Sequence, residues 1–322
     1  GRFHNPTWSL YEQALSELEG GPAVAFASGM AAVAAVLGVV LRPGDVVVLP
    51  SESYYTTRVL ADNYFAAMGV QMRLAPTADN AQQQHLAGAK LLWLESPSNP
   101  GLDVCDISTL ALAAHAAGAL VAVDNTTATV LGQQPLALGA DFSVASDTKA
   151  LLGHSDLILG HVATQDPTWE ARIRTWRTQM GAIPGPMEVW LAHRSLPTVD
   201  LRLTRQGQNA LAIAQLLTRH VARYPGLPND PAYTIAARQM QHFGPVVSFV
   251  LADRAHAEQF LAACQLVYEA TSFGGLHTTA ERRARWGGDV IPDGFIRLSA
   301  GCEDPEDLLA DLTQALETLA GL

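Results

Sequence analysis

Lysine is almost absent from this chain. Of its 322 residues, 20 are lysine or arginine and 31 are aspartate or glutamate, which gives a formal net charge of −11. Only two of the basic residues are lysines, Lys90 and Lys149. Clustered positive charge neutralises nucleic-acid phosphates and anionic lipid head groups, so the composition argues against binding to either. Any chemistry that requires a lysine amine therefore has two candidates.

Cysteine and long apolar runs are scarce as well. The three cysteines, Cys105, Cys264 and Cys302, are widely spaced and odd in number, which is neither a disulfide framework nor a zinc pattern. The longest apolar run, residues 30–41, is shorter than the roughly 20 residues that a helix needs to cross a bilayer. We therefore expect a cytoplasmic protein with reduced thiols. Because Gly1 opens directly into a motif, we also expect a further segment to precede it.

The first half of the chain alternates short apolar runs with helical patterns. Apolar strands bounded by turns, with helices between them, are typical of a mostly parallel sheet buried on both faces. The expected strands are residues 23–27, 46–49, 70–74, 90–95, 120–124, 141–145 and 157–164.

The pattern changes after about residue 165. The expected helices are residues 169–180, 187–196 and 199–223. The last of these should cross to a smaller α+β domain, in which strands are expected at residues 246–251 and 295–299 and helices from about 255 and at 305–319. The prediction is an α/β protein with a large domain of residues 1–198 and a linking helix plus small domain of residues 199–322.

Polar residues follow several expected strands at their carboxyl ends, where ligands bind in open α/β sheets. Lys149 suits Schiff-base chemistry, and the hydroxyls of Ser146 and Thr148 beside it suit a phosphate. Asp124 could pair with a protonated ring nitrogen, as pyridoxal phosphate requires. The residues alone equally allow an ordinary surface lysine and a turn-capping aspartate. Lys90 fits the solvated start of a strand.

Three other segments are candidates for binding an anion or a substrate. Gly29 joins a strand to a helix, where free amides of the first turn bind anions. Two prolines constrain the loop from Glu95 to Pro100 and direct Asn99 to the same sheet edge. Arg297 could bind a substrate carboxylate through two nitrogens. The alternatives are a plain strand–helix joint, a rigid loop without a ligand and a solvent-facing strand position.

Together these segments resemble the cystathionine gamma-synthase/gamma-lyase family of pyridoxal-phosphate enzymes, which have fold type I. The matching motifs follow the family order over nearly the whole chain, and the ordered set is far more specific than any one of them. They are Arg2…Asn5-Pro6-Thr7, Ser28-Gly29-Met30-Ala31-Ala32, Tyr54, Glu95…Asn99-Pro100, Val123-Asp124-Asn125-Thr126, Ser146…Thr148-Lys149, Gly153-His154-Ser155-Asp156 and Arg297-Leu298-Ser299…Gly301…Glu303-Asp304.

The resemblance implies roles for individual residues. Lys149 would hold pyridoxal phosphate as a Schiff base and later move protons, Asp124 would pair with the ring nitrogen, and Tyr54 would stack on the ring and assist catalysis. The other cofactor-binding residues implied are Gly29, Met30, Thr126, Ser146 and Thr148. The substrate-binding residues implied are Asn99, Arg297, Glu95 and His277.

The resemblance also implies a homo-oligomer with shared active sites. The family arginine that corresponds to Arg2 reaches the phosphate in a neighbouring protomer, and a tetramer is the usual assembly. A family tyrosine that serves the same phosphate would lie just before Gly1. The expected partners are a small amino-acid substrate and further copies of the chain, without metal, nucleic acid or membrane.

The chain departs from the family pattern after Gly275. The family carries there a loop with an acidic or hydroxyl-bearing residue that ends in Met-Thr-His, whereas here the loop is shorter, and His277 replaces either the acidic residue or the histidine. Asp147 also stands where a small residue is common. The expected activity is γ-elimination by a cystathionine gamma-lyase. The alternatives are a cystathionine gamma-synthase, a methionine gamma-lyase, or a protein that binds the cofactor without turnover.

Overall fold

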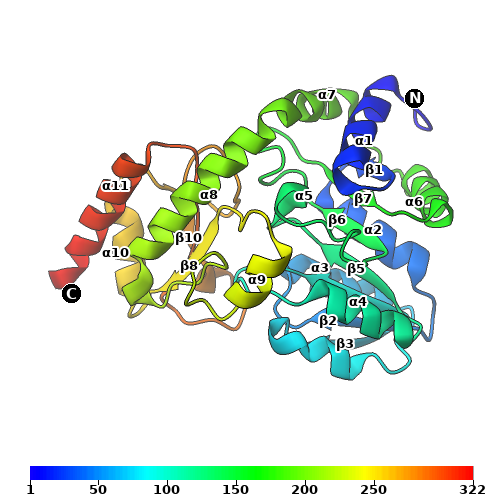
Figure 1. The fold of residues 1–322 in the computed structure, drawn as a ribbon, viewed down its shortest axis with the longest axis horizontal. Helices are drawn as coiled ribbons and strands as arrows, with labels where there is room; N and C mark the ends of the chain where they lie inside the picture. Colours follow the sequence, from blue (N-terminus) through cyan, green and yellow to red (C-terminus); the bar gives the residue numbers. More distant parts are fainter. Residues whose placement is uncertain (322) are drawn as a thin grey trace.

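Seven buried strands form the central sheet of the N-terminal part of the protein. The computed structural model describes residues 1–321 (Figure 1). The strands are β1 (Ala23–Phe26), β2 (Val46–Pro50), β3 (Gln71–Ala75), β4 (Leu91–Glu95), β5 (Leu120–Asp124), β6 (Phe142–Ala145) and β7 (Gly160–Ala163). Their order is β1-β7-β6-β5-β4-β2-β3, and β7 alone runs antiparallel to its two neighbours. The predicted mostly parallel sheet is confirmed.

Helices cover both faces of this sheet and bury its strands away from solvent. They are α1 (Pro6–Glu19), α2 (Gly29–Val40), α3 (Tyr55–Leu60) with a π-helical turn (Ala61–Ala66), α4 (Ile107–Ala116), α5 (Thr129–Gly132), α6 (Pro167–Met180) and α7 (Pro186–Ser195). Helix α2 is apolar on nearly all sides because it packs between the sheet and α6. A Cβ on Gly38 would lie 2.0 Å from the Trp176 ring, so glycine is needed there for α6 to approach.

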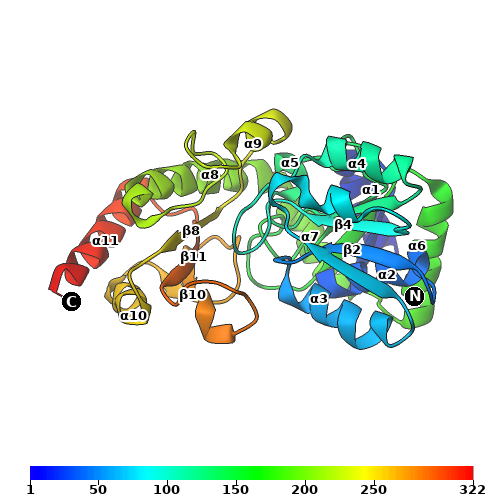
Figure 2. The same cartoon turned by 90° about the horizontal axis from the view of Figure 1, so that it is seen from below.

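Helix α8 (Val199–Leu216) connects the two parts of the protein, as Figures 1 and 2 show. Leu203, in its first half, is buried in a core of the large sheet, whereas Ile213 is buried in the core of the C-terminal part. The expected helix over residues 199–223 is wrong at its end. The chain leaves the helix after Leu216, Val221 takes a left-handed φ of 51°, and Arg223 forms a β-bridge with Ser248.

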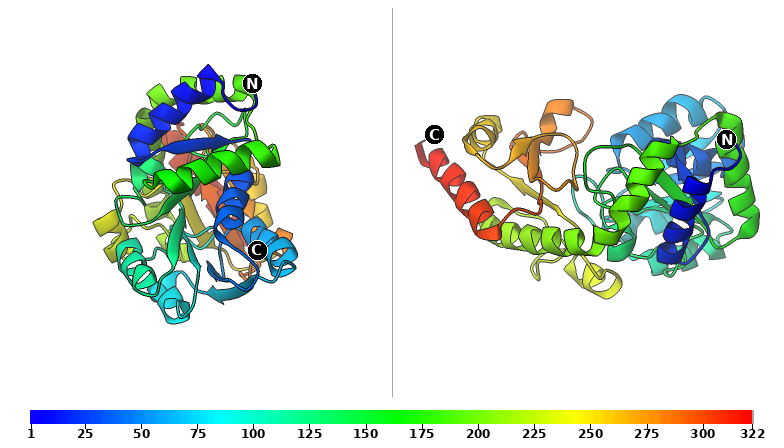
Figure 3. Two further views of the ribbon diagram at one scale, coloured as in Figure 1. Left: turned by 90° about the vertical axis from the view of Figure 1, so that its right-hand side faces the viewer. Right: turned by 90° about the horizontal axis from the view of Figure 1, so that it is seen from above.

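The C-terminal part is built on a four-stranded sheet in the order β8-β11-β10-β9. The strands are β8 (Val246–Val250), β9 (Tyr268–Glu269), β10 (Thr279–Arg282) and β11 (Phe295–Ser299), and helices α9 (Tyr233–Gln239), α10 (Arg254–Ala263) and α11 (Pro305–Glu317) accompany them. The sequence did not predict β9, β10 or α9. The two parts lie end to end, so the molecule is elongated (Figure 3). The domain boundary at residues 198/199 stays a prediction.

Within residues 1–321, no helix is both long and apolar enough to cross a membrane.

Candidate active site

A cavity of about 610 Å³ lies where the carboxyl ends of β4, β5 and β6 meet loops of the C-terminal part. It brings together most of the residues that the sequence singled out. These are Gly29, Met30, Tyr54, Glu95, Asn99, Asp124, Thr126, Ser146, Thr148, Lys149 and Arg297. They come from six separate segments of the chain, so the fold alone makes them neighbours.

One end of the cavity is formed by the first turn of α2. The Ser28 hydroxyl caps this helix by accepting from the Ala31 amide at 3.1 Å, which leaves the earlier amides free to donate to a ligand. Gly29 lies against Ser146, and a Cβ on Gly29 would come within 2.6 Å of the Ser146 Cβ. Glycine is therefore required for the helix end to approach the strand-end hydroxyls. This arrangement suits a phosphate group.

A buried carboxylate stands at the end of β5. The amide and the hydroxyl of Thr126 both donate to Oδ1 of Asp124, at 3.1 and 2.6 Å. Burial raises the pKa of Asp124 despite these two hydrogen bonds, which lower it. A buried carboxylate is stabilised by a cation, and a protonated ring nitrogen in the cavity would supply one.

Lys149 lies opposite Phe273 in the cavity. Its Nζ is 3.1 Å from the Ser272 hydroxyl and 5.2 Å from the centre of the Phe273 ring. Burial, together with the positive charge of Arg297, lowers the pKa of Lys149 to about 8, although Glu281 acts in the opposite direction. At pH 7 about a tenth of this amine is therefore uncharged, far more than for an ordinary lysine, and the uncharged form is the one that attacks a carbonyl carbon.

Glu95 organises two of the other cavity residues. Its carboxylate accepts from the backbone amide of Tyr54 at 2.7 Å and from that of Asn99 at 2.8 Å. Burial, with the nearby charge of Asp124, raises the pKa of Glu95 well above its usual value. Both carboxylate oxygens of Glu95 accept hydrogen bonds from backbone amides, so Glu95 positions Tyr54 and Asn99. Its predicted contact with a substrate stays a prediction.

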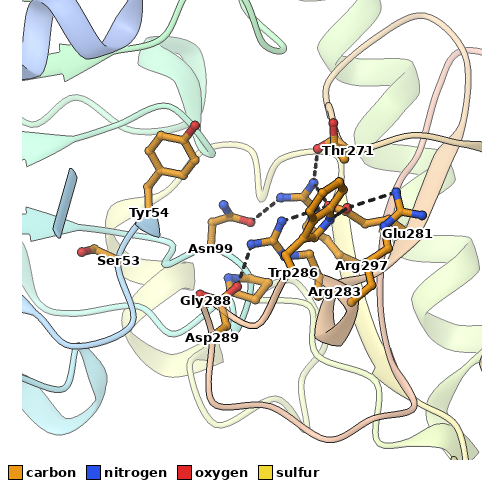
Figure 4. Close-up of polar contacts among 12 residues, drawn as sticks. Ser53, Tyr54, Asn99, Thr271, Glu281, Arg283, Trp286, Gly288, Asp289 and Arg297 are labelled. Atoms are coloured by element: carbon orange, nitrogen blue, oxygen red, sulfur yellow. Dashed lines mark hydrogen bonds and ion pairs between the residues drawn. The ribbon is translucent and has the colours of Figure 1, made fainter. Parts of the chain in front are cut away.

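Arg297 is held in place at the opposite wall, where β11 passes the cavity. It is 4% exposed and donates to the Asn99 side-chain oxygen at 2.7 Å, to the Thr271 carbonyl and to the Glu281 carboxylate (Figure 4). Burial lowers the pKa of Arg297 to about 10, against the opposing effect of Glu281. A fixed guanidinium on a wall of the cavity is suited to bind a carboxylate through the N–H groups that these three bonds leave unused.

Two of the predicted site residues lie away from the cavity of their own chain. Arg2 is exposed at the N-terminal end, where its guanidinium is 5.1 Å from the Phe3 ring. The His277 side chain is 74% exposed, and its Nδ1 lies 3.8 Å from the carboxylate of Glu303. The predicted roles of Arg2 across an interface and of His277 in substrate binding stay predictions.

Several cavity residues were missed by the sequence reasoning. Thr271, Phe273, Arg283, Trp286 and Gly288 all line the cavity. Three of them belong to the arginine-rich stretch after Gly275, where the sequence departs from the family pattern. The departure from the family pattern was the sequence signal for this stretch. The pairing of β10 with β11, which the sequence does not show, decides which side chains of the stretch face the cavity.

A second buried polar network lies below the loop that carries Lys149. His161 contacts Asp147 through Nδ1 at 2.5 Å and Glu19 through Nε2 at 2.9 Å. The Tyr11 hydroxyl donates to the other oxygen of Asp147 at 2.9 Å. The acidic residue that looked unusual beside the Thr-Lys motif is therefore matched by a histidine on the neighbouring strand.

The residues described by the structure contain no group of three or more histidine, cysteine or acidic side chains that could hold a metal ion.

Comparisons with known proteins agree with this geometry. Residues 1–317 match the family model described as Cys/Met metabolism PLP-dependent enzyme. A Streptomyces coelicolor protein named "Putative cystathionine gamma-lyase" is 56% identical over 326 residues, which cover 98% of this chain and 83% of that protein. A cystathionine gamma-synthase of Mycobacterium tuberculosis is 40% identical over 98% of this chain and 85% of its own length.

A solved structure shows the same fold. The structure of cystathionine gamma synthase from Xanthomonas oryzae pv. oryzae in complex with cystathionine is similar with a TM-score of 0.96 and 35% identity, covering 99% of this chain and 87% of that one.

Proposed function

Because the chain belongs to the Cys/Met metabolism PLP-dependent enzyme family, we propose that it catalyses γ-elimination on a sulfur amino acid. The proposed reaction converts cystathionine and one water molecule to cysteine, 2-oxobutanoate and ammonia. The observation that carries this proposal is the convergence of Lys149, Asp124 and Arg297 on one cavity. The name of the 56% identical Streptomyces coelicolor relative supports cystathionine as the first substrate to test.

The residues present fit pyridoxal phosphate. The first turn of α2 with Gly29 and Met30, and the hydroxyls of Ser146 and Thr148, would hold the phosphate. Asp124 would pair with the ring nitrogen. Its burial, with one oxygen already held by Thr126, is the observation that supports this assignment.

Tyr54 lines the same cavity and would stack on the ring. Lys149 would be the point of attachment, because burial keeps its amine partly uncharged.

The chain's own side chains would then orient the substrate and move its protons. Pyridoxal phosphate, when bound, supplies the electron sink that lets protons leave carbon. Arg297 and Asn99 would bind the α-carboxylate and so fix the Cα–H bond toward Lys149. The Lys149 amine, with its lowered pKa, would accept the Cα proton and later return a proton to carbon.

Two related reactions use the same residues and are the alternatives. The Mycobacterium tuberculosis relative is named a cystathionine gamma-synthase, and a 36% identical relative from Pseudomonas deceptionensis is named an L-methionine gamma-lyase. Replacement of the acyloxy group at Cγ of an O-acyl-homoserine by the thiol of cysteine, with release of the carboxylic acid, would give the synthase reaction. Release of methanethiol from methionine would give the other lyase.

We propose that active sites are completed in a dimer. Arg2 is exposed and lies outside the cavity of its own chain, which suits a role in a neighbouring protomer. Mixing an Arg2→Ala protein with a Lys149→Ala protein should restore part of the activity, because some mixed dimers then hold one intact site. Activity of Arg2→Ala equal to that of the unchanged protein would contradict the proposal.

We also propose that the protein is located in the cytoplasm, which cell fractionation would test.

A substrate panel on the cofactor-loaded protein tests the reaction. Cystathionine, methionine, and O-succinyl-homoserine with cysteine are supplied separately, and ketoacid, thiol and ammonia are measured. The proposal predicts equal amounts of 2-oxobutanoate, ammonia and cysteine from cystathionine. Cystathionine formation from O-succinyl-homoserine without ketoacid would make the protein a synthase. No product from any substrate would overturn the assignment as an enzyme of this type.

A further inference from the structure

The segment from Glu281 to Asp289, here called the arginine-rich segment, forms part of the cavity wall. Arg283, Trp286 and Gly288 of this segment line the cavity. The segment is attached to both parts of the protein. Glu281 lies opposite Arg297 in the pairing of β10 with β11, and the Arg58 side chain, from α3, donates to the Gly288 carbonyl at 3.3 Å. Its side chains therefore have fixed positions relative to the catalytic lysine.

Arg283 is held firmly but uses only two of its five N–H groups in hydrogen bonds to the described residues. Its Nη2 donates to Asp289 at 2.6 Å and its Nη1 to Glu281 at 3.1 Å, and the side chain is only 13% exposed. Its Nε is buried and finds no acceptor among the described residues. A buried donor without a partner is costly, and a ligand acceptor at this position would remove that cost.

The Arg283 guanidinium stands beside that of Arg297. Both donate to the same oxygen of Glu281, Oε1 (Figure 4). On this wall three guanidiniums, those of Arg58, Arg283 and Arg297, share two carboxylates, those of Glu281 and Asp289. One positive charge is therefore left over among these five groups, and the α-carboxylate assigned to Arg297 balances it. A second carboxylate would depend on the N–H groups of Arg283 that Glu281 and Asp289 leave unused.

Trp286 keeps Glu281 engaged with the two arginines. Its indole nitrogen donates to Oε2 of Glu281 at 2.9 Å, while Oε1 binds the guanidiniums. The Trp286 side chain lines the cavity and is 57% exposed, so it stands at the solvent side of this cluster. His277, which the sequence suggested for substrate selection, has no part in this wall.

Building on the proposed function, we infer that Arg283 determines substrate specificity by binding a second carboxylate. With the α-carboxylate on Arg297, this second carboxylate belongs to the part of the substrate beyond the carbon–sulfur bond that breaks. The site then prefers a dicarboxylic sulfur amino acid, such as cystathionine, to one that ends in an alkyl group, such as methionine.

Steady-state kinetics with three variants test this inference. Arg283→Gln should lower kcat/KM for cystathionine about ten- to hundredfold, chiefly through KM, because a hydrogen bond to a charged group is lost. The change for methionine should stay below about threefold. Arg283→Lys should recover part of the loss. Arg254→Gln is the matched control, since Arg254 forms an exposed ion pair with Glu258 and does not line the cavity. Equal losses for both substrates would overturn the inference.

A binding measurement separates this inference from the proposed reaction. Suberate has its two carboxylates the same number of bonds apart as cystathionine, and octanoate has only one. Calorimetry on the cofactor-loaded protein should show tighter binding of suberate than of octanoate, and Arg283→Gln should abolish the preference. A preference that persists in the variant would overturn the role of Arg283. Lack of turnover with every sulfur amino acid would instead overturn the proposed function and leave this readout intact.

Discussion

The guanidinium of Arg297 donates a hydrogen bond of 2.7 Å to the side-chain oxygen of Asn99. Arg297 belongs to the C-terminal sheet and Asn99 to the loop after β4, so this bond joins the two parts of the protein at the cavity. Asn99 is itself fixed through its amide, which donates to Glu95. A carboxylate entering the cavity therefore meets an arginine that is already oriented, which reduces the entropy lost on binding.

Arg297→Lys should weaken the binding of all α-amino-acid substrates to the same extent. A lysine cannot hold Asn99, Thr271 and Glu281 and bind a carboxylate as well, because it lacks the planar set of five N–H donors, so kcat/KM should fall about ten- to hundredfold for cystathionine and for methionine. Measuring both substrates distinguishes Arg297 from Arg283, whose loss should affect cystathionine alone. Arg254→Lys, in an exposed ion pair with Glu258, is the control. A loss restricted to one substrate would contradict the assignment of the α-carboxylate to Arg297.

The lowered pKa of Lys149 predicts how cofactor attachment depends on pH. Burial and Arg297 lower this pKa to about 8, so the rate at which the cofactor-free protein attaches pyridoxal phosphate should rise with pH through an inflection near that value. Arg297→Gln removes a charge that lowers the pKa, so the inflection should move to higher pH. Stopped-flow absorbance measures the rate. An inflection that stays in place or moves to lower pH would contradict this account.

The buried network around His161 predicts a pH-dependent stability. Burial opposes the charged form, but Asp147 and Glu19 outweigh it and raise the pKa of His161 from 6.5 to about 10. A pKa raised on folding stabilises the folded state fully below the unfolded value and loses this effect as the pH rises through the folded value. The contribution of His161 should therefore be intact at pH 6 and decline up to about pH 10.

Denaturant unfolding of a His161→Gln variant checks this dependence. At pH 7 the variant should lose about 3–5 kcal/mol, because two buried carboxylates lose their cation. The difference from the unchanged protein should narrow as the pH approaches 10. His115→Gln, in a partly exposed pair with Asp141, should cost less than about 1 kcal/mol. A difference that does not vary with pH would show that His161 is not charged in the folded protein.

Much of the large sheet and of the cofactor end of the cavity could be predicted from the sequence. Apolar runs such as residues 120–124 are long enough to identify buried strands, and Asp124 and Lys149 follow such strands directly. Parallel strands bring their carboxyl ends to one edge, so strand assignment alone places these residues together. The order of the sequence motifs, through their resemblance to the family, supplied the roles of these residues, which the spacing of strands and helices does not indicate.

The rest depends on contacts between distant segments. Strand β10 contains Glu281 and Arg282, which do not form an apolar pattern, and it exists because it pairs with β11. The placement of Arg283 on the cavity wall follows from that pairing. Likewise, Asp147 looked like an unexplained departure until β7 brought His161 against it. Helix α8 ends at Leu216, and a 3-10 turn (Thr218–His220) precedes the left-handed φ of Val221, none of which helix periodicity indicates.

Borohydride reduction followed by peptide mapping tests the central claim most directly. The chain has two lysines, so only Lys149, Lys90 and the terminal amine can carry the label. Reduction of the cofactor-loaded protein should place the pyridoxyl group on the peptide that contains Lys149, and Lys149→Ala should lose it while Lys90→Ala keeps it. A label on the peptide of Lys90, or one that persists in Lys149→Ala, would contradict the account.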